Sequence, residues 1–381
     1  MGGAFETGSN RNFFTEIGFS EEEVDLRVLE TFNTIFFGPD EDRFYHPVGD
    51  SMGYITDTGN HDVRTEGMSY GMMMCVQMDQ RDIFDRLWLW TKTYMYMDSG
   101  ANAGFFCWSN QTDGTKNSNG PAPDGEEFFA MALIFAANRW EGGREDCEYM
   151  REARALLHTM LHKGENGEGG RAMWDRENDL IRFIPEVDFS DPSYHLPHFY
   201  QLFSLFSNES DRDFWRRAAQ ASRDYLVRAS HTETGLSAEY AEYDGTPYAG
   251  ENKDFAGHDV YYSDAYRTIA NIALDWSWFA ADPRQVNIAS NLQRFFCETV
   301  REKPFGIYKV DGTVMDGTAL HPVAMTAVNA QASLASDGPY ARECVERFWN
   351  TPLRKGDRRY YDNCLYMFAM LALSGRYQIW I

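Results

Sequence analysis

Three acidic side chains lie where apolar helical patterns begin. Glu66 lies in DVRTEGMSYGMMM, Asp124 in NGPAPDGEEFFAMALIFAANRW and Asp264 in HDVYYSDAYRTIANIALD. The free amide groups and the dipole of a helix favour an acid in its first turn, so helix capping explains each acid taken alone. A set of carboxyl groups can also carry out acid–base chemistry, provided that one is held protonated and another ionised.

Aromatic residues accompany these acids. Cleavage of a glycosidic bond uses one protonated carboxyl group, which donates to the leaving oxygen, and one ionised carboxylate. Flat apolar rings beside them would let sugar rings stack. Six residues could serve in this way: Trp108, Tyr70, Tyr194, Tyr261, Tyr262 and Tyr266. Core packing is the simpler interpretation of any single one.

Apolar residues recur at helical spacing along the whole chain. This spacing predicts twelve helices, over residues 20–37, 66–79, 81–97, 125–140, 149–163, 192–207, 211–230, 262–280, 284–300, 322–336, 338–350 and 360–374. Alternating strand character is limited to short runs around Arg182 to Val187 and Gly306 to Val310, so any sheet is peripheral. The predicted fold class is all-α.

Helix starts carry their own sequence signals. Ser20 and Glu23 have the spacing of a capping box. Asp191-Pro192 and Asp282-Pro283 each place an acceptor at the cap and a proline in the first turn. No Pro-rich linker, charge block or shift in composition divides the chain, so we expect residues 1–381 to form a single domain.

The long connections are placed unevenly. Residues 98–124, 164–191 and 231–261 all precede even-numbered helices, and loops of this length in a compact domain are usually functional. Every even-numbered helix begins with polar or titratable residues: Glu66, Asp124, Tyr194 with His195, Asp264, His321, and Tyr361 with Asp362. If alternate helices run in the same direction, as in a closed ring of helical hairpins, these starts meet on one face. We therefore expect a cleft there.

Composition excludes some classes of partner. The chain has 35 Lys and Arg against 58 Asp and Glu, a net charge of −23. A surface this negative repels nucleic acid and anionic membranes. The N-terminus lacks the pattern of a secretory signal, and the apolar run from Leu365 to Leu373 is about half the length of a membrane span. Six scattered cysteines without a CxxC pair indicate reduced thiols, so we expect a cytoplasmic protein.

Two histidine pairs have spacings that could hold a metal ion. They are His158 with His162 and His195 with His198. Neither pair has HExxH form or an acidic third ligand at an obvious spacing, so we interpret all four as structural and predict no metal site. The chain also has no Walker loop, dinucleotide fingerprint or GxSxG elbow, and we expect no cofactor.

Several segments resemble the glycoside hydrolases of family 8. The stretch from Ala122 to Trp140 resembles the signature segment of that family. Glu66-Gly67 with Ser69-Tyr70-Gly71 resembles its acid motif, and Ser263-Asp264 followed by Arg267 its base motif. The likeness covers essentially the whole chain and implies an (α/α)6 barrel. Pro123, Glu126 and Phe129 depart from the residues usual in the family, which indicates a divergent branch.

Within this family, the chain is most similar to members that release xylose from the reducing end of xylooligosaccharides. The runs GNHDVRTEGMSYGMMM, DGTKNSNGPAPDGEE, PEVDFSDPSYHLPHFYQLFSL and RRYYDNCLYMFAMLALSG carry this likeness. It implies inversion at the anomeric carbon, with Glu66 as general acid, Asp264 as general base and Asp124 binding and distorting the sugar.

The same likeness implies further sugar contacts. Tyr194 and Arg267 would position the base and the water, and the loop Leu320-His321-Pro322 would block the cleft just past the cleavage point. Without the likeness, His321-Pro322 is explained as a helix start. The full set of candidate substrate-binding residues is Tyr194, Arg267, His321, Trp108, Arg64 and Tyr361.

The acid and the base need opposite charge states. We expect apolar walls to raise the pKa of Glu66, and Arg64 to point away or to meet another acid. An endo-acting xylanase, glucanase or chitosanase of the same fold remains an alternative, as does a helical scaffold that binds sugar or peptide without turnover. The expected partner is a xylooligosaccharide, and we expect a monomer or a weak homo-oligomer.

Overall fold

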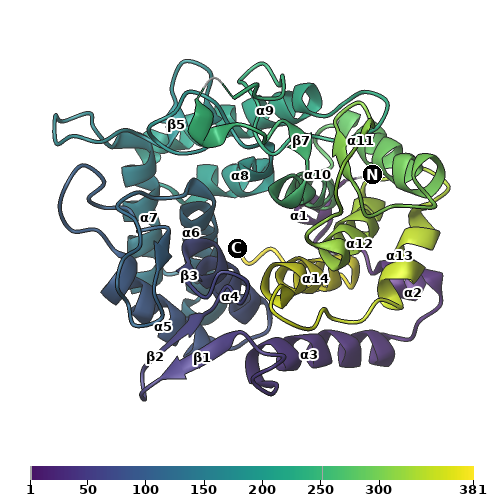
Figure 1. Ribbon diagram of the computed structural model, residues 1–381. Helices are drawn as coiled ribbons and strands as arrows, with labels where there is room; N and C mark the ends of the chain where they lie inside the picture. The colour runs from purple at the N-terminus through teal and green to yellow at the C-terminus, as the bar shows by residue number, and fades with distance from the viewer. Residues whose placement is uncertain (1, 251) are drawn as a thin grey trace.

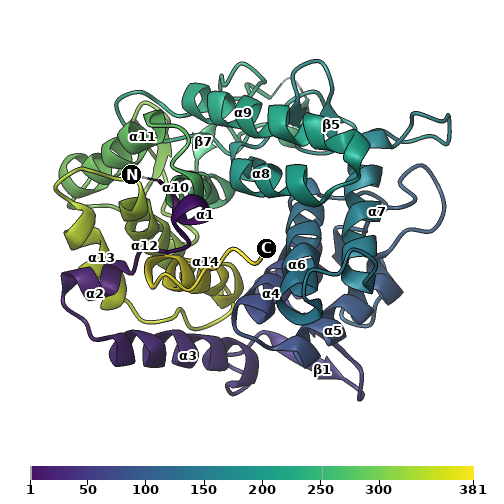
Figure 2. The ribbon, with the colours of Figure 1, turned by 180° about the vertical axis from the view of Figure 1, so that it is seen from behind.

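The structure is a computed structural model that describes residues 2–250 and 252–381. Twelve long helices in this part of the chain form two concentric rings (Figure 1, and from behind Figure 2). The inner ring holds α4 (Thr65–Gln77), α6 (Pro123–Glu141), α8 (Pro197–Phe206), α10 (Tyr266–Phe279), α12 (Pro322–Gln331) and α14 (Arg359–Leu373). The outer ring holds α3 (Glu21–Phe37), α5 (Arg81–Trp90), α7 (Glu148–His162), α9 (Arg212–Ala229), α11 (Arg284–Arg294) and α13 (Ala341–Trp349).

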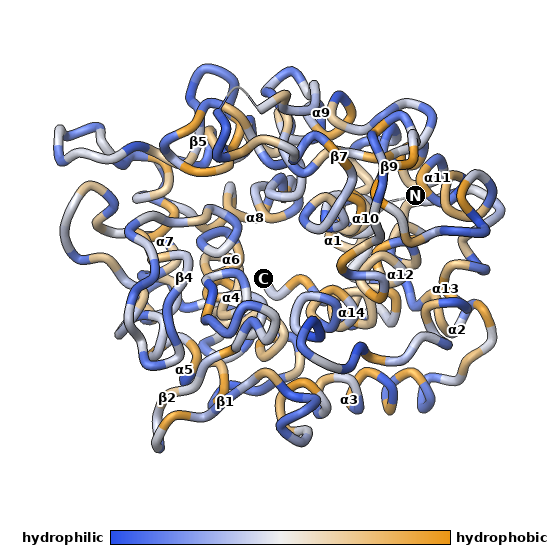
Figure 3. Tube along the Cα trace, viewed as in Figure 1, coloured by the Kyte–Doolittle hydropathy of each residue, from blue (hydrophilic) through white to orange (hydrophobic). Residues whose placement is uncertain are grey.

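The rings confirm the predicted all-α class and the (α/α)6 barrel. The outer helices α5, α7, α9, α11 and α13 each pack on the inner helix that precedes them in the sequence, and the last helix, α14, packs on both α3 and α4, which closes the ring. Burial explains the two layers. Inner helices such as α6 are buried on all sides from Pro123 to Ala137, whereas outer helices such as α9 bury one face only. Figure 3 shows the difference as more continuous apolar colour on the inner helices.

Three predicted helices are not regular α-helices over their whole predicted length. The predicted helix 192–207 is a short turn, η2 (Pro192–Tyr194), followed by α8. Pro197 explains the break, because the residue before a proline avoids helical angles and Leu196 is non-helical, with φ −120° and ψ 64°. The predicted helices 81–97 and 284–300 instead end in π-helical turns, η1 (Thr91–Met95) and η6 (Phe295–Thr299).

The strands are short and lie in the connections. They form four antiparallel sheets: β1 (Tyr45–Val48) with β2 (Met52–Ile55), β3 (Val63–Arg64) with β4 (Ser109–Asn110), β5 (Trp174–Asp175) with β6 (Leu180–Ile181), and β7 (Val260–Tyr261), β8 (Ile307–Lys309) and β9 (Val314–Met315). The run predicted at Gly306 to Val310 is confirmed as β8. The strand predicted from Arg182 to Val187 is wrong, because β6 ends at Ile181 and turns follow. The sequence pattern also missed every other strand and two short helices, α1 (Ala4–Thr7) and α2 (Phe13–Ile17).

The C-terminal tail closes one end of the barrel. In both views of the ribbon the C-terminus lies at the centre of the ring (Figures 1 and 2). The backbone N–H of Gln378 and the indole of Trp380 donate to Gln77 Oε1 at 3.0 and 3.2 Å, and the indole of Trp278 donates to the Tyr377 carbonyl. These partners lie at the carboxyl ends of inner helices, so the tail covers that end of the barrel. None of the described helices is both long and apolar enough to span a membrane.

Candidate active site

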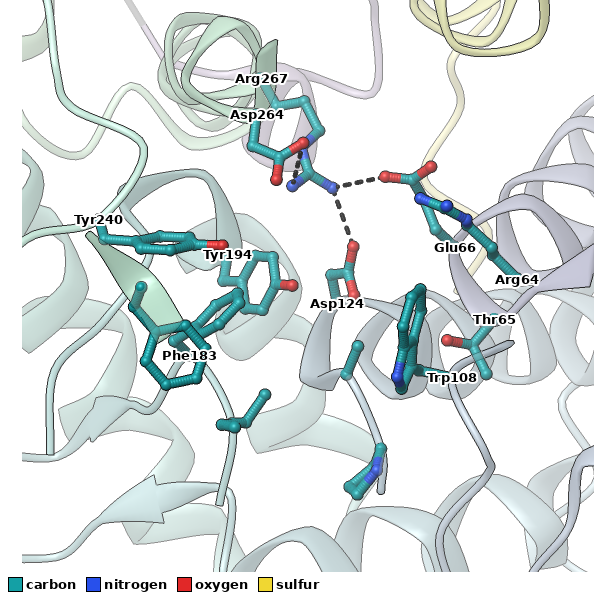
Figure 4. A pocket seen from close by; sticks show the side chains of 14 residues that line it. Arg64, Thr65, Glu66, Trp108, Asp124, Phe183, Tyr194, Tyr240, Asp264 and Arg267 are labelled. Carbon is teal, nitrogen blue, oxygen red and sulfur yellow. Dashed lines mark hydrogen bonds and ion pairs between the residues drawn. The ribbon is translucent and has the colours of Figure 1, made fainter. Parts of the chain in front are cut away.

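A cavity of about 370 Å³ opens at the amino ends of the inner helices. Glu66 is the second residue of α4, Asp124 is the second residue of α6, and Asp264 lies in the 3-10 turn η5 (Ser263–Ala265) that leads into α10. All three line the cavity, together with Arg267, and their carboxyl groups lie on one side of it (Figure 4). The expected meeting of helix starts in one cleft is therefore found for Glu66, Asp124, Tyr194 and Asp264.

Arg267 joins the three acids. Its buried guanidinium donates from one nitrogen to Glu66 Oε2 at 3.0 Å, to Asp124 Oδ2 at 2.8 Å and to the Tyr70 hydroxyl at 3.1 Å. The other terminal nitrogen lies 3.6 Å from Asp264 Oδ1. One cation thus neutralises part of the charge of the acids, which is why they can lie together in a largely buried site.

Glu66 has the electrostatics of a proton donor. Burial raises its pKa from 4.5 to about 7, Arg267 opposes that rise, and the neighbouring Asp124 and Asp264 add to it. The Tyr360 hydroxyl donates to Oε1 at 2.7 Å, so each carboxyl oxygen has a partner. The expectation that burial raises the pKa of Glu66 is confirmed.

Asp124 has a hydrogen-bond partner at each of its carboxyl oxygens. Its Oδ1 accepts from the Gly125 amide at 2.9 Å, and its Oδ2 accepts from Arg267. Burial raises the pKa of Asp124, and Arg267 opposes that rise. The Asp124 carboxylate therefore has a fixed direction and faces the cavity.

Asp264 is the most exposed of the three acids. Its side chain is 35% exposed, against 15% for Glu66 and 7% for Asp124. Its backbone N–H donates to Glu239 Oε1 at 3.4 Å, and Glu239 in turn contacts His258. The preceding Ser263 has φ +26°, an uncommon conformation that fixes the direction of the turn. Asp264 therefore has access to water from a rigid turn.

Aromatic rings form two walls of the cavity. Tyr194, in η2, is buried, and the Arg267 guanidinium carbon lies 5.4 Å from its ring centroid. On the other side, Trp108 is 37% exposed and faces the Arg64 guanidinium at 5.2 Å. Arg64 pairs with Asp62 at 3.0 Å and Asp57 at 3.3 Å. The expectation that Arg64 meets other acids is confirmed.

Residues on two long connections were missed by sequence reasoning. Phe183, Tyr240 and Phe255 line the cavity. Phe183 and Tyr240 lie opposite Trp108 (Figure 4), and their rings pack 4.3 Å apart between centroids. They come from the connections 164–191 and 231–261. The unusual length of these connections was the one sequence feature that indicated a functional role. Neither segment has a periodic pattern that could show which side chains face inward.

Four of the aromatic residues considered as sugar platforms do not line the cavity. Tyr261 and Tyr266 are buried core residues that pack on each other, because η5 directs them toward η6 and away from the cavity. Tyr70 is buried between Phe128 and Phe368 and reaches the site only through its hydroxyl. Tyr262 is half-buried and is not one of the residues that line the cavity.

His321 and Tyr361 lie beside the cavity rather than among its lining residues. His321 is the N-cap of α12, and its Nδ1 lies 2.9 Å from Oδ2 of the buried Asp362. Its ring lies 4.6 Å from that of Tyr361, whose hydroxyl donates to the Ser263 carbonyl at 3.2 Å. A chain of contacts therefore links His321 to the turn that carries Asp264.

The chain is similar to known proteins along almost its whole length. A family model described as "Glycosyl hydrolases family 8" matches residues 48–375. The chain is 57% identical to the reducing end xylose-releasing exo-oligoxylanase of Halalkalibacterium halodurans, over 99% of this chain and 96% of that protein. It is 54% identical to Rex8A of Paenibacillus barcinonensis, and the structure of Rex8A complexed with xylose superimposes with a TM-score of 0.96 over 100% of both chains. This chain belongs to glycosyl hydrolase family 8.

Proposed function

We propose that the protein releases xylose from the reducing end of β-1,4-xylooligosaccharides, with inversion of the anomeric carbon at the cleaved bond. The observation that carries this proposal is the pair of carboxyl groups, Glu66 and Asp264, facing one cavity across Arg267. The names of the relatives that share more than half of this sequence support the choice of substrate.

Glu66 would act as the general acid. A carboxyl group with a pKa of about 7 still carries its proton in mildly acidic and near-neutral solution, where an ordinary glutamate does not. In that state it can protonate the glycosidic oxygen as the bond breaks, so that xylose leaves as a neutral alcohol.

Asp264 would act as the general base. Inversion requires a water molecule between the base and the anomeric carbon, and hence a separation of about 6.5 to 9.5 Å between the two carboxyl groups. Because both groups contact a single guanidinium, their separation has an upper limit of roughly 9 Å, which is compatible with that range. Tyr194 and Arg267 would hold the base and its water in place.

Asp124 and the aromatic walls would bind the sugar chain. Asp124 lies between the acid and the base in the site and would accept hydrogen bonds from the ring at the cleavage point, favouring a distorted ring. Trp108, held against Arg64, offers a flat face to a neighbouring xylose. Phe183 and Tyr240 offer another on the opposite wall.

The exo action would depend on the loop around His321. Asp362 accepts from the Ala324 amide at 2.8 Å as well as contacting His321, and Arg354 contacts both Asp362 and the Leu320 carbonyl. These contacts would fix the loop as the wall that leaves room for one xylose past the cleavage point, with Tyr361 between the wall and the turn of Asp264.

We further propose that the whole chain acts as one catalytic domain in the cytoplasm, as a monomer or a weak homo-oligomer. The closure of the ring by α14 on α3 supports one domain. All six cysteines are buried and free, which supports a reducing compartment. Imported oligosaccharides would then be the substrate.

Xylotriose that carries 13C only in its reducing-end sugar tests the proposal. We expect the label in free xylose and none in the xylobiose formed, and proton NMR should show the new reducing end of xylobiose first as the α-anomer. An endo-acting enzyme would instead shorten polymeric xylan rapidly. A scaffold without turnover would bind the trisaccharide and leave it intact, and Glu66→Ala would not change that binding.

A further inference from the structure

A histidine pair and a buried aspartate come together between two outer helices, away from the cleft. His158 and His162 lie one turn apart on the same face of α7, and their rings stack 4.2 Å apart. Asp211, the last residue of the 3-10 turn η3 (Glu209–Asp211), faces them from the start of α9. In the sequence this acid comes 49 residues after His162, which is why the histidine pair had no visible third ligand.

We propose that His158, His162 and Asp211 form a binding site for a divalent transition-metal ion such as Zn²⁺. One nitrogen of each histidine and one oxygen of the aspartate lie within 4.8 Å of one another, and no other such cluster of three occurs in residues 2–250 and 252–381. The sequence-based interpretation of this histidine pair as purely structural is therefore revised.

The distances suit an ion of this size. Asp211 Oδ1 lies 2.9 Å from His162 Nε2, and Asp211 Oδ2 lies 3.4 Å from His158 Nδ1. Tetrahedral zinc with bonds of about 2.1 Å separates its ligand atoms by about 3.4 Å. Both distances lie within about 0.5 Å of that separation, and the three ligand atoms all lie within 4.8 Å of one another, so rotation of the side chains would admit the ion. Two imidazoles favour zinc, nickel or copper over magnesium and calcium, which prefer oxygen ligands.

The surroundings of the pair resemble the outer shell of a metal site. Glu165 Oε2 lies 2.8 Å from His162 Nδ1, so it can hold a proton there and leave the Nε2 lone pair facing Asp211. A lone pair and a carboxylate oxygen at 2.9 Å repel each other unless a positive centre lies between them. Arg176 pairs with Glu165 at 2.6 Å and lies 3.1 Å from the same Nδ1. With the metal absent, Arg176 can donate to Nδ1 while a proton on Nε2 occupies the place of the ion.

The three proposed ligands differ in how exposed their side chains are. The Asp211 side chain is only 2% exposed and accepts from the Ser210 hydroxyl at 3.0 Å, so its direction is fixed. His158 is 53% exposed, which leaves an open path for the ion and room for water as a further ligand. The ion would link α7 to the start of α9, two helices of the outer ring (Figure 1), and so stabilise the barrel without entering the reaction.

Titration calorimetry with ZnCl2 on protein treated with a chelator tests the site. We expect one Zn²⁺ per chain, a rise in the unfolding temperature with Zn²⁺ and none with Mg²⁺. His158→Gln, an exposed position where folding is safe, should weaken binding at least tenfold, and His162→Gln should do the same. Xylotriose hydrolysis should be unchanged in both variants.

His46→Gln provides the matched control, because His46 is a partly buried histidine on β1 that packs against Tyr54 and lies outside the cluster. It should bind Zn²⁺ as the unmodified protein does. The proposal is overturned if the unmodified protein binds no Zn²⁺, or if His158→Gln and His162→Gln bind it with unchanged affinity.

Discussion

Arg267 donates to Glu66 at 3.0 Å across 201 residues of sequence. The contact joins the first turn of α10 to the first turn of α4, on opposite sides of the inner ring. The same guanidinium contacts Asp124 and Asp264. The pKa values of Glu66 and Asp124 therefore depend on a residue from another part of the chain.

Glu66→Gln should remove the proton donor while keeping the shape of the side chain. We expect kcat for xylotriose to fall by roughly 10²- to 10⁴-fold, the usual contribution of general acid catalysis. Activity on xylobiosyl fluoride should largely survive, because fluoride leaves without a proton. Glu16→Gln, at an exposed glutamate that pairs with Arg11, is the control and should be fully active. Equal losses on both substrates would contradict the assignment.

Tyr360→Phe should shift the pH dependence of the reaction. The Tyr360 hydroxyl donates to Glu66 Oε1 and lowers the pKa of that carboxyl group by stabilising its ionised form. Without this donor the pKa rises, so the basic limb of the kcat/KM profile should move to higher pH. Measured profiles from pH 4 to 9 would show this. A basic limb that stayed in place, or moved to lower pH, would argue against Glu66 as the titrating group.

Glu66 should also make the fold less stable as pH rises. Its pKa is raised in the folded protein to about 7 from 4.5, so the folded state binds the proton more tightly than the unfolded state. The stabilising effect is complete below about pH 4.5 and is lost as pH rises through 7. A shift of this size corresponds to about 3 kcal/mol.

Glu66→Gln should therefore be more stable than the unmodified protein at pH 8, by about 3 kcal/mol, and similar to it near pH 4.5. Urea unfolding at the two pH values measures the difference. If Glu66→Gln destabilised the protein equally at both, the carboxyl group would not carry the raised pKa.

Asp362→Asn should loosen the wall at His321. Asp362 contacts the His321 ring and accepts a hydrogen bond from a backbone amide in the first turn of α12. Asparagine lacks the negative charge that pairs with Arg354, so this anchor of the loop is weakened. We expect kcat/KM for xylotriose to fall roughly ten- to a hundredfold, as for loss of a charged hydrogen bond. Xylohexaose should then give xylobiose as well as xylose as an early product, which chromatography of the products measures.

Asp275→Asn is the matched control for that change. Asp275 is equally buried and pairs with Arg223 at 2.8 Å, outside the lining of the cleft. It should lower stability similarly while leaving xylose as the sole early product. If both variants altered the products alike, general loosening of the fold would explain the effect. That result would contradict a specific role of Asp362 in fixing the wall at His321.

The sequence by itself determined the twelve long helices and the positions of the three acids at their starts. Helical spacing and caps are local, and the capping box of Ser20 and Glu23 is present as predicted. The motifs around Glu66, Asp124 and Asp264 were also readable, because each lies within a short run of residues.

Only the tertiary structure decided what those residues meet. Burial, Asp124 and Asp264 raise the pKa of Glu66 and Arg267 lowers it, and no short window of sequence contains all four residues. Phe183 and Tyr240 lie on aperiodic connections, and Tyr261 and Tyr266 turned out to be core residues. Asp211 reaches the histidines of α7 through packing alone. Local spacing sets the elements, whereas burial, charge and long-range contacts arise when the ring closes.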